Sequence, residues 1–340
     1  MKPLVSILIP AYNAETWIAE AIQSAVAQTW PQKEIIVIND GSTDRTAEIA
    51  RRFASKHLTV LSTSNRGLSA AVNHGYRQCQ GDFIQELDAD DLLAPDKIGR
   101  QLAALRKGDS PRILLSCPWA PFFHRTSSAR FVHTSLCQDL SPVEWFLRAM
   151  GGNLHMQNAT WLVSRELADA AGSWDERLHY DQDGEYFARV IVASESTRFV
   201  PGTGIFYRLS PSSRVSYIGN SDLKKDSLLR SLKLHIQYLR SLEESERVRK
   251  VCVNYLQTWY GALYPERPDI LAEMEALAGQ LGGRLTLPRL CWKYAWMEPL
   301  FGRKAAKSAQ NYLANFKASS MRQIDKTINE FEVRRKVDVV

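Results

Sequence analysis

The chain has 340 residues, of which 45% are hydrophobic and 24% are charged. These fractions are ordinary for a globular protein and exclude a disordered or fibrous chain, and the length allows a full-sized core and two domains. The five cysteines lie far apart without CxxC or Cys/His spacing, which favours buried thiols over disulfides or a structural zinc.

The formal net charge of +6 is concentrated near the C-terminal end, where residues 284–336 hold twelve Lys and Arg against four Asp and Glu. A solvated helix face is one explanation. The other is peripheral contact with an anionic membrane surface, because aromatic residues share this stretch. They are Trp292, Tyr294, Trp296, Phe301, Tyr312 and Phe316. Nucleic acid is not an expected partner, since no recognised module accompanies the charge.

Hydropathy predicts no membrane-spanning segment, because no apolar run approaches the roughly 20 residues that a bilayer requires. The N-terminal residues enter a strand pattern directly, without the features of a signal peptide. We therefore expect a cytoplasmic protein, with the basic C-terminal helices as a possible peripheral contact at the inner face of the membrane.

The first half alternates short apolar runs with helical patterns, which predicts an α/β fold with a mostly parallel sheet covered by helices. Strands are expected at residues 5–9, 34–38, 59–62 and 82–87, with Pro10 ending the first. Helices are expected at residues 15–28, 43–53 and 68–78, the second capped by Ser42 or Thr43. Functional residues of such sheets gather at the carboxyl ends of strands, and Tyr12, Asp40 and Asp88 occupy three of these ends.

The second half is less regular. We expect strands at residues 113–117, 160–163 and 205–209, a helix at 183–193, and a loop-rich stretch between them. After residue 220 long helical patterns follow, interrupted by Pro265, Pro268 and Pro288. This change predicts two domains, an α/β domain of residues 1–218 and a mainly helical region of residues 219–340.

The segment Glu86-Leu87-Asp88-Ala89-Asp90-Asp91 places several carboxylates at the end of a strand. Their repulsion is tolerated where a cation or hydrogen-bond donors compensate it, and oxygen ligands suit Mg²⁺ or Mn²⁺ bridging to substrate phosphates. The alternative is a solvated acidic turn that precedes a helix opening near Pro95 and Asp96. The segment alone does not decide between them.

Asp40 and Tyr12 follow neighbouring strands, in the segments Ile38-Asn39-Asp40-Gly41 and Pro10-Ala11-Tyr12-Asn13. Ordinary turn chemistry accounts for Gly41 and the residues after it. It accounts less well for an acid beside an aromatic ring, a pair that can hold a nucleobase by stacking and by accepting its N–H.

Taken together, ILIPAYN, EIIVINDGSTD, NRGLSAAVNHG, GDFIQELDADDLLAPDKI and GSWDERLHYDQDGEYFARV resemble glycosyltransferase family 2, the inverting enzymes of GT-A fold. The resemblance covers about residues 3 to 210. It implies a GT-A (Rossmann-like) sandwich with a helical C-terminal region and transfer of a sugar from a nucleotide-sugar donor. It also implies a Mn²⁺ or Mg²⁺ cofactor.

The resemblance assigns donor-binding roles residue by residue. Tyr12, with Pro10 and Ala11, corresponds to the strand end that stacks on the nucleobase, and Asp40 to the acid that accepts from it. The DxD motif is matched by Asp88, Ala89 and Asp90, with Asp91 next; Asp90 and Asp91 are both candidates for the principal metal ligand. The glycine-rich helix start is matched by Asn65, Gly67 and Asn73. Val72 replaces the arginine often found there, which leaves Arg66 as a candidate for that contact.

The resemblance also places the general base in an acidic pair at the head of a helix, six residues before an arginine. Counting from Arg189, the pair falls on Gln182 and Asp183, so Asp183 is the candidate base, with Asp181 and Glu185 as rivals. An Asp at a helix N-terminus is also an ordinary capping residue. Arg208 and Arg214, near Ser212 and Ser213, resemble a segment that contacts the diphosphate, although Ser210 replaces its histidine.

The expected reaction is a single inverting displacement in which Asp183 deprotonates an acceptor hydroxyl. The expected donor is a nucleotide sugar, and UDP- and dTDP-sugars are the first candidates. The expected acceptor is a glycan or lipid-linked sugar, contacted by His155 or Trp161. Two alternatives stay open. A nucleotidyltransferase would normally bring a glycine-rich, lysine-bearing phosphate loop, and a catalytically silent nucleotide-sugar-binding protein would bind donor without transfer.

Overall fold

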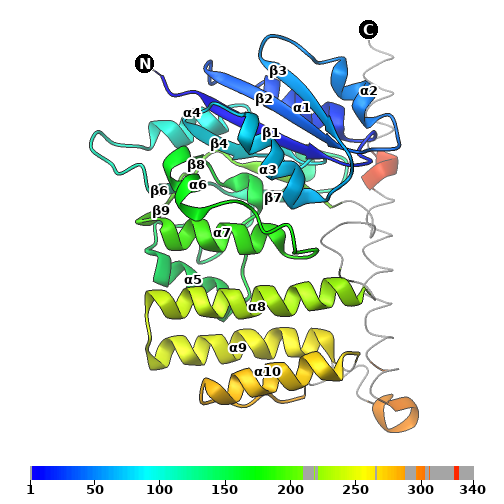
Figure 1. The fold of residues 1–340 in the computed structure, drawn as a ribbon, viewed down its shortest axis with the longest axis vertical. Helices are drawn as coiled ribbons and strands as arrows, with labels where there is room; N and C mark the ends of the chain where they lie inside the picture. The colour runs from blue at the N-terminus through cyan, green and yellow to red at the C-terminus, as the bar shows by residue number, and fades with distance from the viewer. Residues whose placement is uncertain are drawn as a thin grey trace. The chain divides into compact units, whose positions relative to one another are not determined.

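The computed structural model describes residues 2–209, 218, 221–264, 266–287, 296–302, 306 and 325–328. Its central sheet has five strands in the order β3-β2-β1-β4-β8 (Figure 1). The strands are β1 Val5–Ala11, β2 Lys33–Asp40, β3 Leu58–Thr63, β4 Phe83–Glu86 and β8 Val163–Ser164. All neighbours are parallel except β4 and β8. The mostly parallel α/β sheet predicted from the sequence is confirmed.

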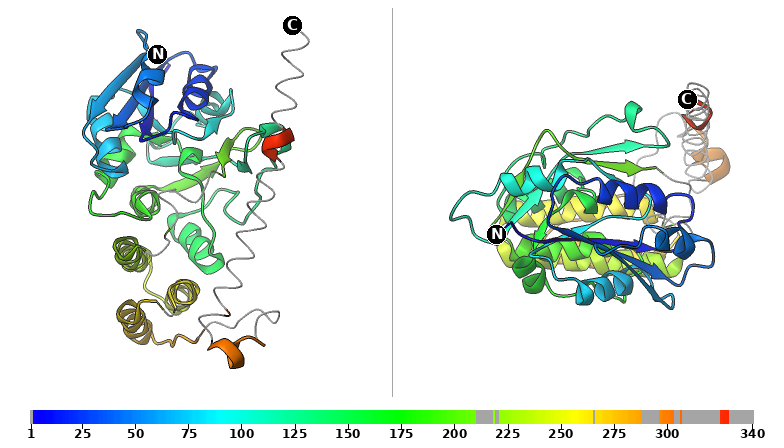
Figure 2. Two further views of the ribbon diagram at one scale, coloured as in Figure 1. Left: turned by 90° about the vertical axis from the view of Figure 1, so that its right-hand side faces the viewer. Right: turned by 90° about the horizontal axis from the view of Figure 1, so that it is seen from above.

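Two helices cover opposite faces of this sheet (Figure 2). Helix α1, Ile18–Val26, shares one buried cluster with Ile7 and Ile9. Helix α3, Leu68–Gln78, lies on the other face, where a side chain at Gly75 would meet Ile38 Cδ1 at 2.7 Å. Successive strand residues point to opposite faces, so both faces are apolar and both are buried.

Two small sheets extend the fold beyond the central one. Strands β5 Leu92–Leu93, β10 Ile205–Arg208 and β7 Trp119–Phe122 form the first, in the order β5-β10-β7. Strands β6 Ile113–Ser116 and β9 Ser196–Phe199 pair in parallel. Because β10 pairs with β5, it lies beside the loop that leaves the central strand β4.

The remaining helices are α2 Thr46–Arg51, α4 Lys97–Ala103, α5 Pro142–Gly152, α6 Arg165–Ala171, α7 Gln182–Ala193, α8 Asp222–Leu242, α9 Glu246–Leu263 and α10 Pro268–Gln280. Two short 3₁₀ turns occupy Thr126–Ser128 and Asn158–Thr160. Helix α7 packs against α6 and α8. Within the described residues, every helix is too short or too polar to cross a bilayer.

The chain forms two compact units, one of residues 1–121 with 130–252 and one of residues 122–129 with 253–340. Helix α8 belongs to the first unit, where it packs against α5 and α7. The predicted helical C-terminal region is present. The division between residues 1–218 and 219–340 stays a proposal.

Two local expectations, the strand end at Pro10 and the cap at Ser42 or Thr43, were wrong. Pro10 lies inside β1, opposite Ile38 of β2. It comes after Leu8, the last residue of β1 that pairs with β4, so its missing N–H removes no hydrogen bond from that pairing. Ser42 and Thr43 do not cap α2, because both bond Asn13 in the loop after β1. The expected break at Pro268 is confirmed: α9 ends at Leu263 and Pro268 begins α10, since the first helical position needs no N–H donor.

Candidate active site

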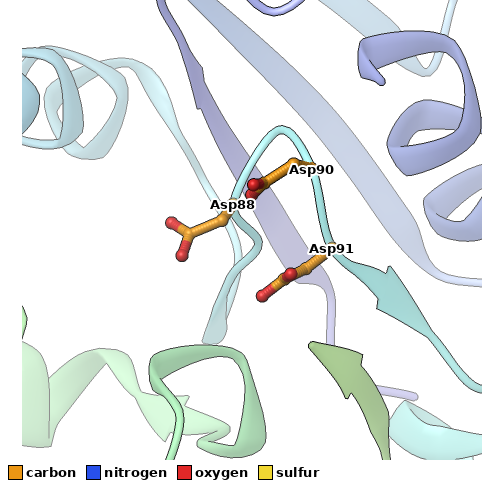
Figure 3. Close-up of side chains that lie close together, drawn as sticks. All are labelled: Asp88, Asp90 and Asp91. Atoms are coloured by element: carbon orange, nitrogen blue, oxygen red, sulfur yellow. The ribbon is translucent and has the colours of Figure 1, made fainter. Parts of the chain in front are cut away.

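The acidic loop of residues 88–91 connects β4 to β5 at the carboxyl edge of the central sheet (Figure 3). Asp88, Asp90 and Asp91 each offer a carboxylate oxygen, and these oxygens lie within 4.8 Å of one another. Asp88 and Asp90 are half-buried, and Asp91 is fully buried. The set contains only oxygen donors at a spacing that one ion can bridge, so it fits Mg²⁺ or Mn²⁺.

Neutral donors orient two of the three carboxylates. Asp91 accepts hydrogen bonds from the Arg208 backbone N–H at 2.7 Å and from Gln157 Nε2 at 3.2 Å. Asp88 accepts one from Asn158 Nδ2 at 3.1 Å. An ionised carboxylate has about four lone-pair sites, so these bonds leave acceptor capacity for a cation. The loop is therefore partly buried and hydrogen-bonded to the protein, which differs from a fully solvated turn, and its carboxylates could hold a metal ion.

The Arg208 guanidinium contacts both this loop and the N-terminal end of α1. Its Nε donates to the Asp90 carbonyl at 2.7 Å, its Nη2 lies 2.6 Å from Glu20 Oε2, and its plane covers the Trp17 ring at 4.2 Å. The side chain is only 1% exposed. These contacts hold the acidic loop to α1 and β10, and contact with a diphosphate stays a prediction for Arg208. Ser210, Ser212, Ser213 and Arg214 lie outside the described residues.

Tyr12 and Asp40 lie at the ends of neighbouring strands, since the residues before them, Ala11 and Asn39, pair with each other. Tyr12 is 52% exposed, whereas Asp40 is buried. The Asp40 carboxylate accepts from the backbone N–H of Gly67 at 2.8 Å and of Arg66 at 3.0 Å. An exposed ring thus lies beside an acid whose position is fixed.

The loop before α3 requires its glycines. Gly67 has φ +90°, a conformation that favours glycine, and it donates the bond to Asp40. A side chain at Gly41, with φ +69°, would come within 2.5 Å of the Asn65 nitrogen. The strand end and the loop of residues 65–67 therefore touch through backbone.

Asn73 and Arg66 have protein partners. Asn73 is buried, donates to the Trp174 carbonyl at 3.0 Å and accepts from the Trp174 N–H at 2.9 Å. Arg66 pairs with Glu176 at 2.9 Å on the surface. Asn73 therefore anchors the segment that leads to α7.

Asp183 lies in the first turn of α7, half-buried, next to the Gly184 backbone. Burial raises the pKa of its carboxyl, against the attraction of His155 and His235. Its charge also acts on Glu86, whose pKa burial raises well above the usual value, with Asp88 and Asp183 adding to the rise. The candidate base and Asp88 of the acidic loop therefore both lie close enough to this buried glutamate to act on its charge.

The two rivals of Asp183 are engaged elsewhere. Glu185 is buried, pairs with Arg189 through both carboxylate oxygens and accepts from the Tyr238 hydroxyl. Asp181 accepts from the Ser231 hydroxyl, and burial raises its pKa to about 6. Because Glu185 is held as an ion pair, it is the poorer proton acceptor.

A group of aromatic rings includes His155, which interacts electrostatically with Asp183. The His155 ring packs against Trp119 at 5.2 Å, and Trp119 meets Tyr207 edge-on at 5.8 Å. His155 is exposed and feels the charge of Asp183. Trp161, by contrast, is 2% exposed and stacks on Phe187 in the core. The expectation that Trp161 contacts an acceptor is therefore wrong.

Sequence reasoning missed Gln157 and Asn158, which orient Asp91 and Asp88, and Trp17 and Glu20, which hold Arg208. Gln157 and Asn158 precede an apolar run in a stretch without periodicity, so no pattern distinguishes them from loop residues. Glu86 was visible in the motif, but only its burial gives it importance.

Comparison with known proteins agrees with this geometry. Residues 6–117 match the family model described as Glycosyl transferase family 2. An uncharacterized glycosyltransferase of Rickettsia typhi is 33% identical over 193 residues, which are 57% of this chain and 60% of that protein. Chondroitin synthase of Escherichia coli is 41% identical over 31% of this chain and 16% of its own length. The chain thus spans about three fifths of the first relative.

Solved structures show the same fold at low sequence identity. TarS of S. aureus in complex with UDP-GlcNAc gives a TM-score of 0.65 at 17% identity, covering 82% of this chain and 81% of that one. The mannosyltransferase PcManGT from Pyrobaculum calidifontis, in complex with GDP-Man and Mn²⁺, gives 0.54 at 18% identity over 99% and 87%. The fold is therefore the GT-A type, and residues 6–117 match glycosyltransferase family 2.

Proposed function

We propose that this protein is an inverting, metal-dependent glycosyltransferase that moves one sugar from a nucleotide-sugar donor to an acceptor hydroxyl in glycan assembly. One observation carries the proposal. Asp88, Asp90 and Asp91 gather after β4 at the sheet edge where Tyr12 and Asp40 also follow their strands, and Asp88 and the half-buried Asp183 both act on Glu86, the last residue of β4. This arrangement supports a metal site and a nucleobase site at one edge of the sheet, with the proposed proton acceptor Asp183 nearby.

The donor is placed by the residues of the strand ends. Tyr12 offers an exposed ring for stacking, and Asp40 offers acceptor sites that its bonds to Arg66 and Gly67 leave over. Asp88, Asp90 and Asp91 would hold the divalent ion, which supplies relief of the charge that grows on the departing diphosphate. The solved neighbours include complexes with UDP-GlcNAc, UDP and GDP-Man. These molecules define the first donors to test.

The proton is removed by Asp183. Burial raises the pKa of its carboxyl, which makes the carboxylate a stronger base. The hydroxyl of the acceptor attacks the anomeric carbon as its proton passes to Asp183. With one displacement and no carboxylate nucleophile in the scheme, configuration inverts. His155, Trp119 and Tyr207 form the wall on which we propose the acceptor sugar rests.

A thermal-shift panel with UDP-, dTDP- and GDP-sugars, each with and without Mn²⁺, tests the donor site. We expect at least one sugar nucleotide to raise Tm, and more so with Mn²⁺. Asp183→Asn should keep this shift and lose release of nucleoside diphosphate, whereas Asp226→Asn, on the exposed face of α8, should keep both. Full turnover in Asp183→Asn would refute the base assignment, and a panel without any shift would refute the function itself.

A further inference from the structure

Helix α8 carries a polar stripe along one face. The stripe consists of Ser227, Ser231, His235 and Tyr238, whose spacing of four, four and three residues places them in line on a helix. The first three are buried in a helix whose other buried residues are mainly leucine. Figure 1 shows α8 running alongside α7, the helix that begins with the candidate base. Buried polar groups in such a position call for partners.

The first stripe residue fixes the chain just before α7. Ser227 Oγ accepts hydrogen bonds from the backbone N–H groups of His179 at 2.9 Å and Tyr180 at 3.1 Å. The same hydroxyl donates to the Tyr180 carbonyl at 3.0 Å. One side chain of α8 thus satisfies three backbone groups of the loop that enters α7.

The other three stripe residues reach the carboxylates on either side of Asp183. Ser231 donates to Asp181 Oδ2, and His235 Nε2 lies 4.0 Å from the same oxygen. Tyr238 donates to Glu185 Oε1 at 2.7 Å. The residues two before and two after the candidate base are both tied to α8.

The segment that enters α7 contains an unfavourable backbone conformation. Asp181 has φ +59°, in the left-handed region where residues other than glycine are uncommon. Its carboxylate folds back so closely over the helix start that a side chain at Gly184 would come within 2.1 Å of Asp181 Oδ1. Such a backbone persists where its surroundings determine it, and α8 provides those surroundings.

We propose that the stripe of α8 is a positioning device for the general base: by holding residues 179–185, it sets where the Asp183 carboxylate lies relative to the acceptor hydroxyl. This inference rests on the proposed role of Asp183. It adds four positioning residues from a helix that the sequence assigned to a separate C-terminal region. A proton acceptor displaced by about 1 Å loses on the order of a hundredfold in rate, so the device has a measurable effect.

His235 also contributes charge. A protonated imidazole attracts the carboxylates of both Asp181 and Asp183 and so lowers the pKa of each. The other titratable groups that act on Asp183, or that it acts on, are Glu86, His155, Tyr180 and Asp181. Removing the imidazole therefore raises the pKa of Asp183 and moves the acid limb of kcat/KM to higher pH.

The experiment follows release of nucleoside diphosphate from UDP-GlcNAc or GDP-Man, whichever gives the stronger thermal shift with Mn²⁺. Ser231→Ala and His235→Gln should each lower kcat at least tenfold, with KM for the donor within about twofold. Asp181→Asn keeps an acceptor oxygen for Ser231, so its kcat should stay within about threefold of wild type. Asp181→Ala lacks this oxygen, and its kcat should fall by more than threefold. His235→Gln should also move the acid limb upward.

Ser241→Ala serves as the matched control, because this exposed serine of α8 bonds only its own helix, at the Tyr238 carbonyl. It should leave kcat unchanged, and all variants should keep the thermal shift with donor, which shows that they fold. Wild-type kcat in both Ser231→Ala and His235→Gln, with Asp183→Asn inactive, would overturn the positioning role alone. An active Asp183→Asn would overturn it together with the proposed base.

Discussion

The buried carboxylate of Asp91 accepts a hydrogen bond from the backbone N–H of Arg208, 117 residues further along the chain, at 2.7 Å. This bond joins the acidic loop to β10, the strand that pairs with β5. The loop is therefore held from both ends, by β4 and by the pair of β5 and β10. The protein's own strand pairing and hydrogen bonds thus hold the three carboxylates together.

Removing one charge from this loop should abolish the effect of the metal while sparing the nucleobase site. Asp88→Asn keeps the side-chain shape, but an amide oxygen is a weaker ligand for a hard cation. We expect the extra rise in Tm that Mn²⁺ gives with a nucleotide sugar to disappear, and the smaller rise without metal to remain. Asp82→Asn, an acid outside the loop, serves as control. An undiminished Mn²⁺ effect in Asp88→Asn would exclude this residue as a ligand.

Asp181→Asn should stabilise the protein at neutral pH. Burial raises the pKa of Asp181 to about 6, so the folded state holds a proton that the unfolded state releases near pH 4. Wild-type stability therefore falls as pH rises from 4 to 6, and asparagine escapes this loss. We expect a gain of about 2 kcal/mol at pH 7.5, from urea unfolding, that vanishes at pH 4. A gain that is equal at both pH values would contradict the assignment.

The buried Lys97 should make the free energy of unfolding rise with pH in the alkaline range, opposite to the effect of Asp181. Its ammonium donates to Gln85 Oε1 and to the Trp161 carbonyl, and burial lowers its pKa to about 8. Because the unfolded state binds more protons between pH 8 and 10.5, wild-type stability rises over this window. Relative to Lys97→Met, the wild type should gain on the order of 2 to 3 kcal/mol between pH 7.5 and 10. Unfolding curves that run parallel for the two proteins would show that Lys97 is protonated throughout.

Substitutions of Trp119, in the proposed acceptor wall, and of Trp161, in the core, should affect different properties, acceptor binding and stability respectively. Trp161 is buried against Phe187, so Trp161→Ala should cost about 3 to 5 kcal/mol of unfolding free energy. Trp119 is half-buried beside His155, so Trp119→Ala should cost less and chiefly raise the KM for acceptor. The pair of measurements is chemical unfolding and transfer kinetics. If Trp119→Ala changed stability alone, the acceptor wall would have to be sought elsewhere.

Contact of the C-terminal residues with membranes stays a prediction. Trp296 and Phe301 are 60% and 64% exposed, while Trp292, Tyr294, Tyr312 and Phe316 lie outside the described residues. Sedimentation with vesicles of phosphatidylserine and phosphatidylcholine at low salt should bring the protein down, and 0.5 M salt should release it. Vesicles of phosphatidylcholine alone provide the control. Equal recovery in the supernatant with both vesicle types would rule the contact out.

Local periodicity predicted the central sheet well, because each of its strands and helices buries a continuous apolar face. Helix α3 was predicted at residues 68–78, the bounds that it has. Helices α5 and α6 were missed, since they lie in a stretch expected to be rich in loops. Their serine caps, Ser141 and Ser164, become visible as caps only once the helices are known.

The residues of the candidate site likewise fall into those that a sequence pattern indicates and those that only the structure identifies. Its carboxylates stand out in the sequence because charged residues at strand ends are conspicuous. The residues that orient them, Gln157 and Asn158, are conspicuous only in space. The polar stripe of α8 is hidden in a helix whose leucines dominate the pattern, and its function depends on a loop some fifty residues away.

Asp40 performs two tasks if the proposed function is right, since the carboxylate that would receive the donor's base already supports the chain's own loop at Arg66 and Gly67. A residue that supports its own scaffold is difficult to exchange when preferences change. Selection in the laboratory for a new nucleotide would therefore conserve Asp40 and collect its substitutions at Tyr12, which faces water.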